Sequence, residues 1–77
     1  MIKADEMFEK LGYEKNDRED CWLEYNREQF EIKKKIAFEK NVHVLFVENN
    51  FGESLPISVK ELQAINEKVK ELGWLNE

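Results

Sequence analysis

The sequence is poor in the residues that form cross-links and metal sites. It contains one cysteine, Cys21, and one histidine, His43. A single cysteine excludes an intramolecular disulfide and a thiolate metal cage built from one chain, and it is typical of a reducing intracellular setting. We therefore expect no metal and no other cofactor.

Long apolar runs are also missing. No stretch approaches the roughly 18 consecutive apolar residues of a membrane helix. The first residues, MIKADE, lack the apolar core of a signal peptide. We therefore expect a cytoplasmic protein without a membrane partner.

The composition favours one folded domain. The chain has 77 residues, of which 42% are hydrophobic and 38% are charged. This balance supports a packed core under a solvated surface. The length suffices for a single domain over residues 1–77 and leaves no room for a separate catalytic domain.

The net charge of −5 is unevenly distributed along the chain. Residues 1–20 and 48–77 carry an acidic excess, whereas residues 21–47 carry a slight basic excess. An acidic chain repels phosphate backbones, so nucleic-acid binding is disfavoured overall. A local basic patch could still act within a Debye length of about 8–10 Å.

Two segments carry helix signals. Residues 2–12 place apolar side chains at helical spacing, with acids in the first turn and Gly12 as a left-handed stop. Residues 58–72 begin with the capping-box sequence SVKE and are followed by Gly73. The buried stripe of this C-terminal helix is predicted to consist of Leu62, Ile65, Val69 and Leu72.

The segment after the first helix predicts the start of an antiparallel meander. Residues 14–20 contain no apolar side chain and are expected to form a loop. Alternating apolar residues predict strands at 22–25 and 30–38, joined by a turn at 26–28. Lys34 interrupts the apolar face of the second strand, which indicates either a twist or a bulge.

Two further strands are expected after residue 41. Residues 42–47, which include His43, are apolar on both faces, as is typical of a central strand or of one whose second face is partly covered. Residues 48–54 contain turn residues, and residues 55–57 are expected to form a short edge strand that tolerates Pro56. The predicted fold class is α+β: a short N-terminal helix, a three- to four-stranded antiparallel meander and a C-terminal amphipathic helix, with both helices on one sheet face.

The titratable residues form no recognisable catalytic motif. His43 would need an orienting carboxylate, and a dyad with Cys21 would need a thiolate-stabilising helix N-terminus or glycine-rich turn, which the sequence does not offer. Asp17, Glu19 and Asp20 lack the spacing of a calcium loop. The chain contains no phosphate-binding loop, zinc motif or nucleophile elbow. We therefore expect no enzyme activity and no catalytic residue.

The run Lys33-Lys34-Lys35 is the only compact basic feature. In a strand its members alternate between faces, which makes a weak phosphate clamp. A solvated face, or a strand edge protected against aggregation, is the simpler interpretation. The aromatic residues near the run, Phe30, Phe38 and Trp22, resemble a stacking platform for single-stranded nucleic acid only where they are exposed, and such residues more often belong to the core. The candidate interaction surface is therefore formed by Trp22, Lys33, Lys35 and His43.

Two terminal stretches carry a family resemblance. Residues 4–13, ADEMFEKLGY, and residues 60–75, which contain KELQAINEK and ELGWL, resemble a family of small uncharacterised proteins from phages, prophages and mobile elements of Gram-positive bacteria. Together with a looser likeness at Glu24-Tyr25, the resemblance covers about half of the chain. The resemblance implies that the gene lies among genes of phages, prophages or mobile elements. It brings no activity, cofactor or functional residue.

These observations favour a non-enzymatic accessory factor that binds a protein partner. The resemblance adds that such a factor would modulate a host system on behalf of a phage or mobile element. Two alternatives stay open: a small nucleic-acid-binding module that uses the Lys33–Lys35 run, and an acidic mimic of nucleic acid formed by the two acidic ends. The sequence leaves the identity of the partner and the oligomeric state open.

Overall fold

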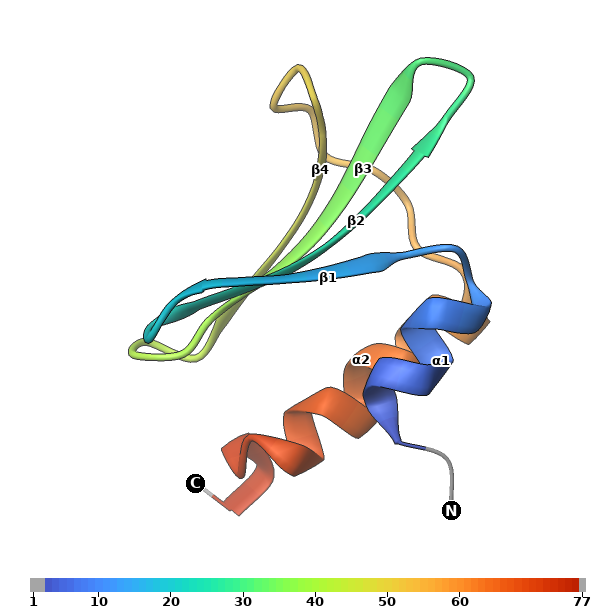
Figure 1. Cartoon of the computed structure of the whole chain (residues 1–77). Helices are drawn as coiled ribbons and strands as arrows, with labels where there is room; N and C mark the ends of the chain where they lie inside the picture. Colours follow the sequence, from blue (N-terminus) through green and yellow to red (C-terminus); the bar gives the residue numbers. More distant parts are fainter. Residues whose placement is uncertain (1–2, 77) are drawn as a thin grey trace.

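The fold is an antiparallel meander with two helices on one side of the sheet (Figure 1). The computed structural model describes residues 3–76. In chain order the elements are α1 (Ala4–Lys10), β1 (Glu14–Glu19), β2 (Trp22–Gln29), β3 (Ile32–Glu39), β4 (Val44–Asn49), α2 (Val59–Glu71) and the short 3₁₀ helix η1 (Trp74–Asn76). The strand order is β1-β2-β3-β4, with every neighbouring pair antiparallel. The predicted α+β class is confirmed.

One strand of the sheet, β1, was not predicted from the sequence. It occupies most of residues 14–20, so the prediction of a loop there is wrong. β1 pairs with β2, with an irregularity in the register between Asn16 and Glu19. An edge strand can be held by backbone hydrogen bonds to one neighbour, and its side chains can face water on both sides. The wholly polar sequence of β1 therefore gives no alternating apolar signal.

The hairpin between β2 and β3 turns at Phe30 and Glu31, and the prediction of a turn at 26–28 is wrong. The two turn residues have φ of 54° and 67°. Two-residue hairpin turns with both φ values positive usually contain Asn or Gly, so Phe and Glu give no turn signal. β2 and β3 pair over their whole lengths in one register, which shows that Lys34 causes no bulge.

β4 begins later than predicted and is the second edge strand of the sheet. His43 has a φ of 55° and lies in the turn between β3 and β4. Residues 55–57 do not form the predicted edge strand; one isolated bridge, Glu48↔Ser54, precedes them.

The hydrophobic core lies between the helices and the sheet. The ring of Phe8 stacks on Tyr25 with centroids 3.9 Å apart, and meets Tyr13 and Phe38 edge-on. Aromatic pairs of this kind add about 0.5–1.5 kcal/mol beyond the burial of their area. The buried core residues are Phe8, Tyr13, Leu23, Tyr25, Ile36, Phe38, Ala64 and Ile65.

The C-terminal helix α2 has the predicted ends but a different buried face. Ser58 forms the capping box with Glu61, and Gly73 follows the helix with a φ of 78°. Leu62, which was expected in the buried stripe, is 44% exposed. Glu61 and Lys68 are buried in its place, because each finds polar partners on the elements that face α2.

Candidate interaction surface

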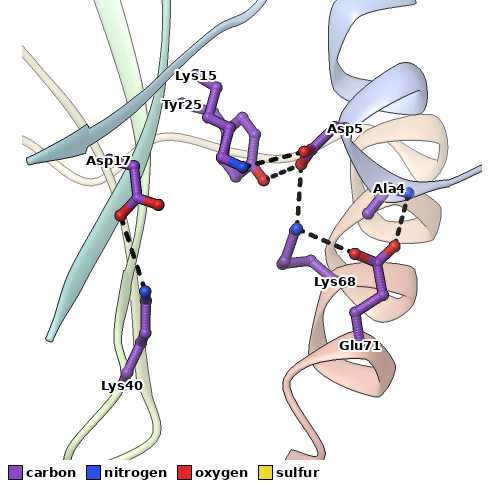
Figure 2. A network of polar contacts seen from close by, with 8 residues as sticks. All are labelled: Ala4, Asp5, Lys15, Asp17, Tyr25, Lys40, Lys68 and Glu71. Atoms are coloured by element: carbon purple, nitrogen blue, oxygen red, sulfur yellow. Dashed lines mark hydrogen bonds and ion pairs between the residues drawn. The ribbon is translucent and has the colours of Figure 1, made fainter. Parts of the chain in front are cut away.

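One polar network joins α1 to the sheet and to α2 (Figure 2). Oδ1 of Asp5 accepts a hydrogen bond of 2.5 Å from the Tyr25 hydroxyl and lies 3.0 Å from Nζ of Lys68, while Oδ2 lies 3.1 Å from Nζ of Lys15. Burial alone would raise the pKa of Asp5, but the hydrogen bonds from Tyr25, Lys68 and Lys15 lower this pKa to about 2. Burial and the bond to Asp5 raise the pKa of Tyr25. At neutral pH Asp5 is therefore ionised and Tyr25 is neutral, and their contact serves the fold.

Lys68 extends this network to the end of α2. Its Nζ lies 3.1 Å from Oε1 of Glu71, and Oε2 of Glu71 accepts a 2.8 Å hydrogen bond from the backbone amide of Ala4. Burial would raise the pKa of Glu71, but the Ala4 amide and Lys68 lower it. The first residue of α1 is thus attached to the last turn of α2.

A second network fixes the start of α2. The carboxylate of Glu61 accepts a hydrogen bond from the Tyr13 hydroxyl, and its two oxygens lie 2.9 and 3.0 Å from Nζ of Lys34. Nη2 of Arg27 lies 3.9 Å away. Burial would raise the pKa of Glu61, but the hydrogen bonds from Tyr13, the Ser58 amide and Lys34 lower this pKa to about 2. Both networks lie between the helices and the sheet, so this side of the sheet is committed to the fold.

The opposite side of the sheet carries neither helix (Figure 1). Directly paired residues in an antiparallel sheet point to the same face, and successive residues alternate. The core pairs Leu23↔Phe38 and Tyr25↔Ile36 point to the helices, so the alternate residues point away from them. We call this second surface the open face; β2, β3 and β4 contribute Trp22, Glu24, Asn26, Glu28, Lys33, Lys35, Ala37, Glu39, Val44, Phe46 and Glu48.

The part of the open face nearest the β3–β4 turn carries the apolar side chains of this face, and Glu39 lies among them, paired with Trp22 on β2 and with Val44 on β4. The ring of Trp22 stacks on that of Phe46, with centroids 5.7 Å apart and planes inclined by 29°. Nζ of Lys35 lies 5.9 Å from the centre of the Trp22 ring. Phe46 is 42% exposed and Val44 is 38% exposed, whereas Ala37 beneath them is fully buried. The two rings thus cover the sheet backbone and remain accessible to a partner.

The rest of the open face is polar and borders a hollow, which is also lined by Lys15 and Arg27, two residues that contact the helix side. The hollow has a volume of about 780 Å³. It is lined by Gly12, Glu14, Lys15, Asn16, Glu24, Asn26, Arg27, Glu28, Lys33, Lys35, Asn49 and Asn50. The lining contains charges of both signs and side-chain amides, which suits hydrogen bonding to a polar partner surface better than binding of an apolar ligand.

Each lysine of the basic run lies beside a glutamate. Nζ of Lys33 is 4.0 Å from Glu28, and Nζ of Lys35 is 3.0 Å from Glu48. Lys34 points to the other side of the sheet and contacts Glu61. The run therefore presents two lysines on the open face, both next to carboxylates, and no block of unbalanced positive charge.

The structure separates His43 from the other three candidate residues. Trp22, Lys33 and Lys35 share the open face, whereas the His43 ring stacks on Trp74 with centroids 4.9 Å apart. Trp74 also meets the core residue Phe38 edge-on, which places this stack on the helix side.

The other residues considered as reactive or metal-binding candidates form no further site among the residues that the structure describes. Cys21 is half-buried in the turn before β2, and its carbonyl accepts a hydrogen bond from the Lys40 amide. Among the side chains that the structure describes, no group of three or more His, Cys, Asp or Glu residues could hold a metal ion. No helix within residues 3–76 is long and apolar enough to cross a membrane.

Sequence reasoning found Trp22 but missed Phe46, its stacking partner. The available signal was the apolar character of residues 42–47 on both faces, which required a cover for the second face.

Comparison of the chain with protein-family models, curated proteins and solved structures found no match.

Proposed function

We propose that this chain is a non-enzymatic protein-binding module that receives its partner on the open face. The observation that carries the proposal is the Trp22–Phe46 stack on a sheet face that bears neither helix. Aromatic anchors of this size supply a large share of the binding energy at protein interfaces when a partner covers them. A sheet face without such a role would ordinarily carry polar side chains.

The surroundings of the stack also suit a protein partner. The polar hollow beside it offers hydrogen-bonding groups of both signs, which matches the usual arrangement of an apolar centre with a polar rim. The Asp5 and Glu61 networks hold both helices to the other side. The open face is therefore presented on a fixed scaffold, and binding needs little ordering of the backbone.

The biological setting that we propose follows the family resemblance. The chain would act in the cytoplasm as an accessory factor of a phage or mobile element, and its partner would be a host protein. Support for this setting comes from the ADEMFEKLGY and ELGWL stretches.

The two nucleic-acid alternatives have weaker support. A binding module that uses Lys33 and Lys35 would have to compete with Glu28 and Glu48 for the same ammonium groups. An acidic mimic needs exposed, aligned carboxylates, but Glu61 is buried and binds Lys34. We therefore place the protein-binding function first.

The proposal is tested by comparing Trp22→Ala with Phe51→Ala. Phe51 is 74% exposed in the turn after β4 and lies outside the Trp22–Phe46 stack, so it is a matched aromatic control. Tagged wild-type protein and both variants are incubated with host-cell lysate, and the retained proteins are identified by mass spectrometry. We expect one protein to bind the wild type and F51A but not W22A.

The binding result is interpreted together with two further measurements, one of the fold of W22A and one of nucleic-acid binding. Circular dichroism must show that W22A keeps its fold. Absence of any protein whose retention depends on Trp22 would refute the proposal. A mobility shift with single-stranded nucleic acid at low salt, abolished by replacing Lys33 and Lys35, would favour the nucleic-acid module instead.

A further inference from the structure

The two edges of the sheet differ in their protection against pairing. β1 has the sequence EKNDRE and a register irregularity, and charges and irregularities are the usual means by which edge strands avoid new partners. β4 begins with Val44, Leu45, Phe46 and Val47. This second edge is apolar on both faces and carries no charge over those four residues.

The outer backbone of β4 is only partly bonded. The carbonyl of Val47 accepts a hydrogen bond of 3.4 Å from the Leu55 amide, and the Asn49 amide donates one of 3.0 Å to the Glu53 carbonyl. Residues 47 and 49 thus direct their backbone groups away from β3, and by the alternation of an antiparallel ladder so does Leu45. Within residues 3–76, no hydrogen bond to the outward amide or carbonyl of Leu45 is present.

These free groups define what can bind there. An outward amide and carbonyl on one residue are both satisfied by an extended strand laid alongside. Segment 53–55 already occupies the far end of β4, so the available stretch is Val44–Phe46. A suitable occupant is a short extended strand with apolar side chains on both faces.

We propose that the occupant is a second copy of this chain, paired through β4 in antiparallel orientation about a two-fold axis at Leu45. β4 itself meets every requirement of the occupant, because it is extended, apolar on both faces and unpaired at the same residue. In this register the amide of Leu45 donates to the carbonyl of Leu45 of the second copy, and the reverse bond also forms.

The register also fixes the side-chain contacts. Val44 lies opposite Phe46 of the second copy on the open face, while the two Leu45 side chains meet on the helix side. The two sheets become continuous, and both Trp22–Phe46 stacks lie near the axis. The stretch has no charge, so the net charge of −5 on each chain opposes pairing only at longer range, where salt screens it.

The expected dimer is weak, because only three residues of each strand overlap and the interface falls at the small end of specific protein contacts. Sedimentation velocity from micromolar to millimolar concentration should show a monomer that becomes a dimer. This association does not rest on the proposed partner binding at Trp22. It is measured on the purified chain alone, so either proposal can fail without the other.

Charge substitutions test the register. Val44→Lys and Phe46→Glu should each weaken association by at least about tenfold, since each places a charged side chain opposite an apolar side chain of the second copy. The double variant V44K/F46E should recover most of the affinity, because the register places each new lysine opposite a new glutamate of the second copy. The matched control V59K/L62E carries the same charges on exposed positions of α2 and should associate like the wild type.

Amide hydrogen exchange gives the residue-level result. The Leu45 amide should exchange quickly in the dilute protein and more slowly as the concentration rises, whereas the Lys15 amide on the β1 edge should not change. A monomer at all concentrations would overturn the inference, as would a dimer without Leu45 protection. Failure of V44K/F46E to recover affinity, or growth of open-ended polymers, would exclude the two-fold pairing.

Discussion

Glu61→Gln tests how strongly the buried network at the start of α2 stabilises the fold. The Glu61 side chain is only 5% exposed, and its pKa falls from 4.5 to about 2 in the folded protein. Each pKa unit corresponds to about 1.4 kcal/mol of difference between the charged and neutral carboxyl. The folded environment therefore favours the carboxylate by about 3 kcal/mol. Glutamine keeps the shape of the side chain and removes the charge.

At pH 7 we expect Glu61→Gln to lower the free energy of unfolding by about 3 kcal/mol. The ammonium group of Lys34 would keep the Pro56 carbonyl at 2.7 Å but lose its carboxylate, and breaking a buried ion pair from one side is strongly destabilising. For a domain of this size the midpoint of thermal unfolding should fall by roughly 10–25 °C. Circular dichroism with urea and heat measures both quantities. Glu67→Gln is the control, because Glu67 makes only a 3.8 Å pair with exposed Lys70 and its loss should cost less than about 1 kcal/mol.

The pH dependence gives an independent check of the same reasoning. The pKa of Glu61 is lower in the folded than in the unfolded chain, so its stabilisation is complete above the unfolded pKa and is lost as the pH falls through the folded pKa. The wild type should lose this contribution between about pH 5 and pH 2, and Glu61→Gln should show a shallower acid limb. A loss below about 1 kcal/mol at pH 7, or an acid limb identical to that of the wild type, would refute the assigned role of Glu61.

Three further substitutions probe other parts of the fold. Phe30→Asn should stabilise the protein by about 0.5–1 kcal/mol in urea unfolding. Phe30 has a φ of 54° and is 87% exposed, and Asn tolerates this backbone conformation better. A loss of stability would show that the Phe30 ring packs against the fold. Gly73→Ala should cost about 1–2 kcal/mol through its φ of 78° alone, since no atom lies within 4 Å of the added carbon; an unchanged midpoint would contradict this. Tyr25→Phe should raise the pKa of Asp5 from about 2 towards its usual range, which NMR shifts of the carboxyl group can follow. A pKa that stays near 2 would show that Lys15 and Lys68 alone are sufficient to lower it.

The parts of the fold that the sequence predicts well are those determined within a few residues. The capping box needs only Ser58 and Glu61, three positions apart, and the left-handed stop needs only Gly73. β1 and the turn at Phe30 lack such local signals. β1 exists because β2 supplies backbone partners, and the turn is imposed by the uninterrupted register of β2 with β3. Neither pairing can be read from the residues involved.

The candidate site shows the same division. Trp22 is recognisable as an aromatic residue near a lysine run, but the aromatic stack that it forms depends on Phe46, which is distant in sequence and reaches it across β3. The role of Glu61 is likewise invisible locally, because helix periodicity treats a glutamate as a solvent-facing residue. Its burial requires Tyr13 and Lys34 from other elements. Such long-range polar contacts have no periodic signature in the sequence.

The two polar networks also explain why one face of the sheet remains available. An apolar helix stripe can shift along a sheet at modest cost, whereas a buried charged group is satisfied only where its partners are. Buried Lys68 of α2 must meet Asp5 of α1, and buried Glu61 must meet Tyr13 and Lys34, so the two helices have one compatible position. Neither helix can move round to cover the Trp22–Phe46 stack without leaving a charged group unpaired, which is strongly destabilising. Within the residues that the structure describes, the accessible rings and the outward backbone groups of Leu45 are thus consequences of how the helices are held.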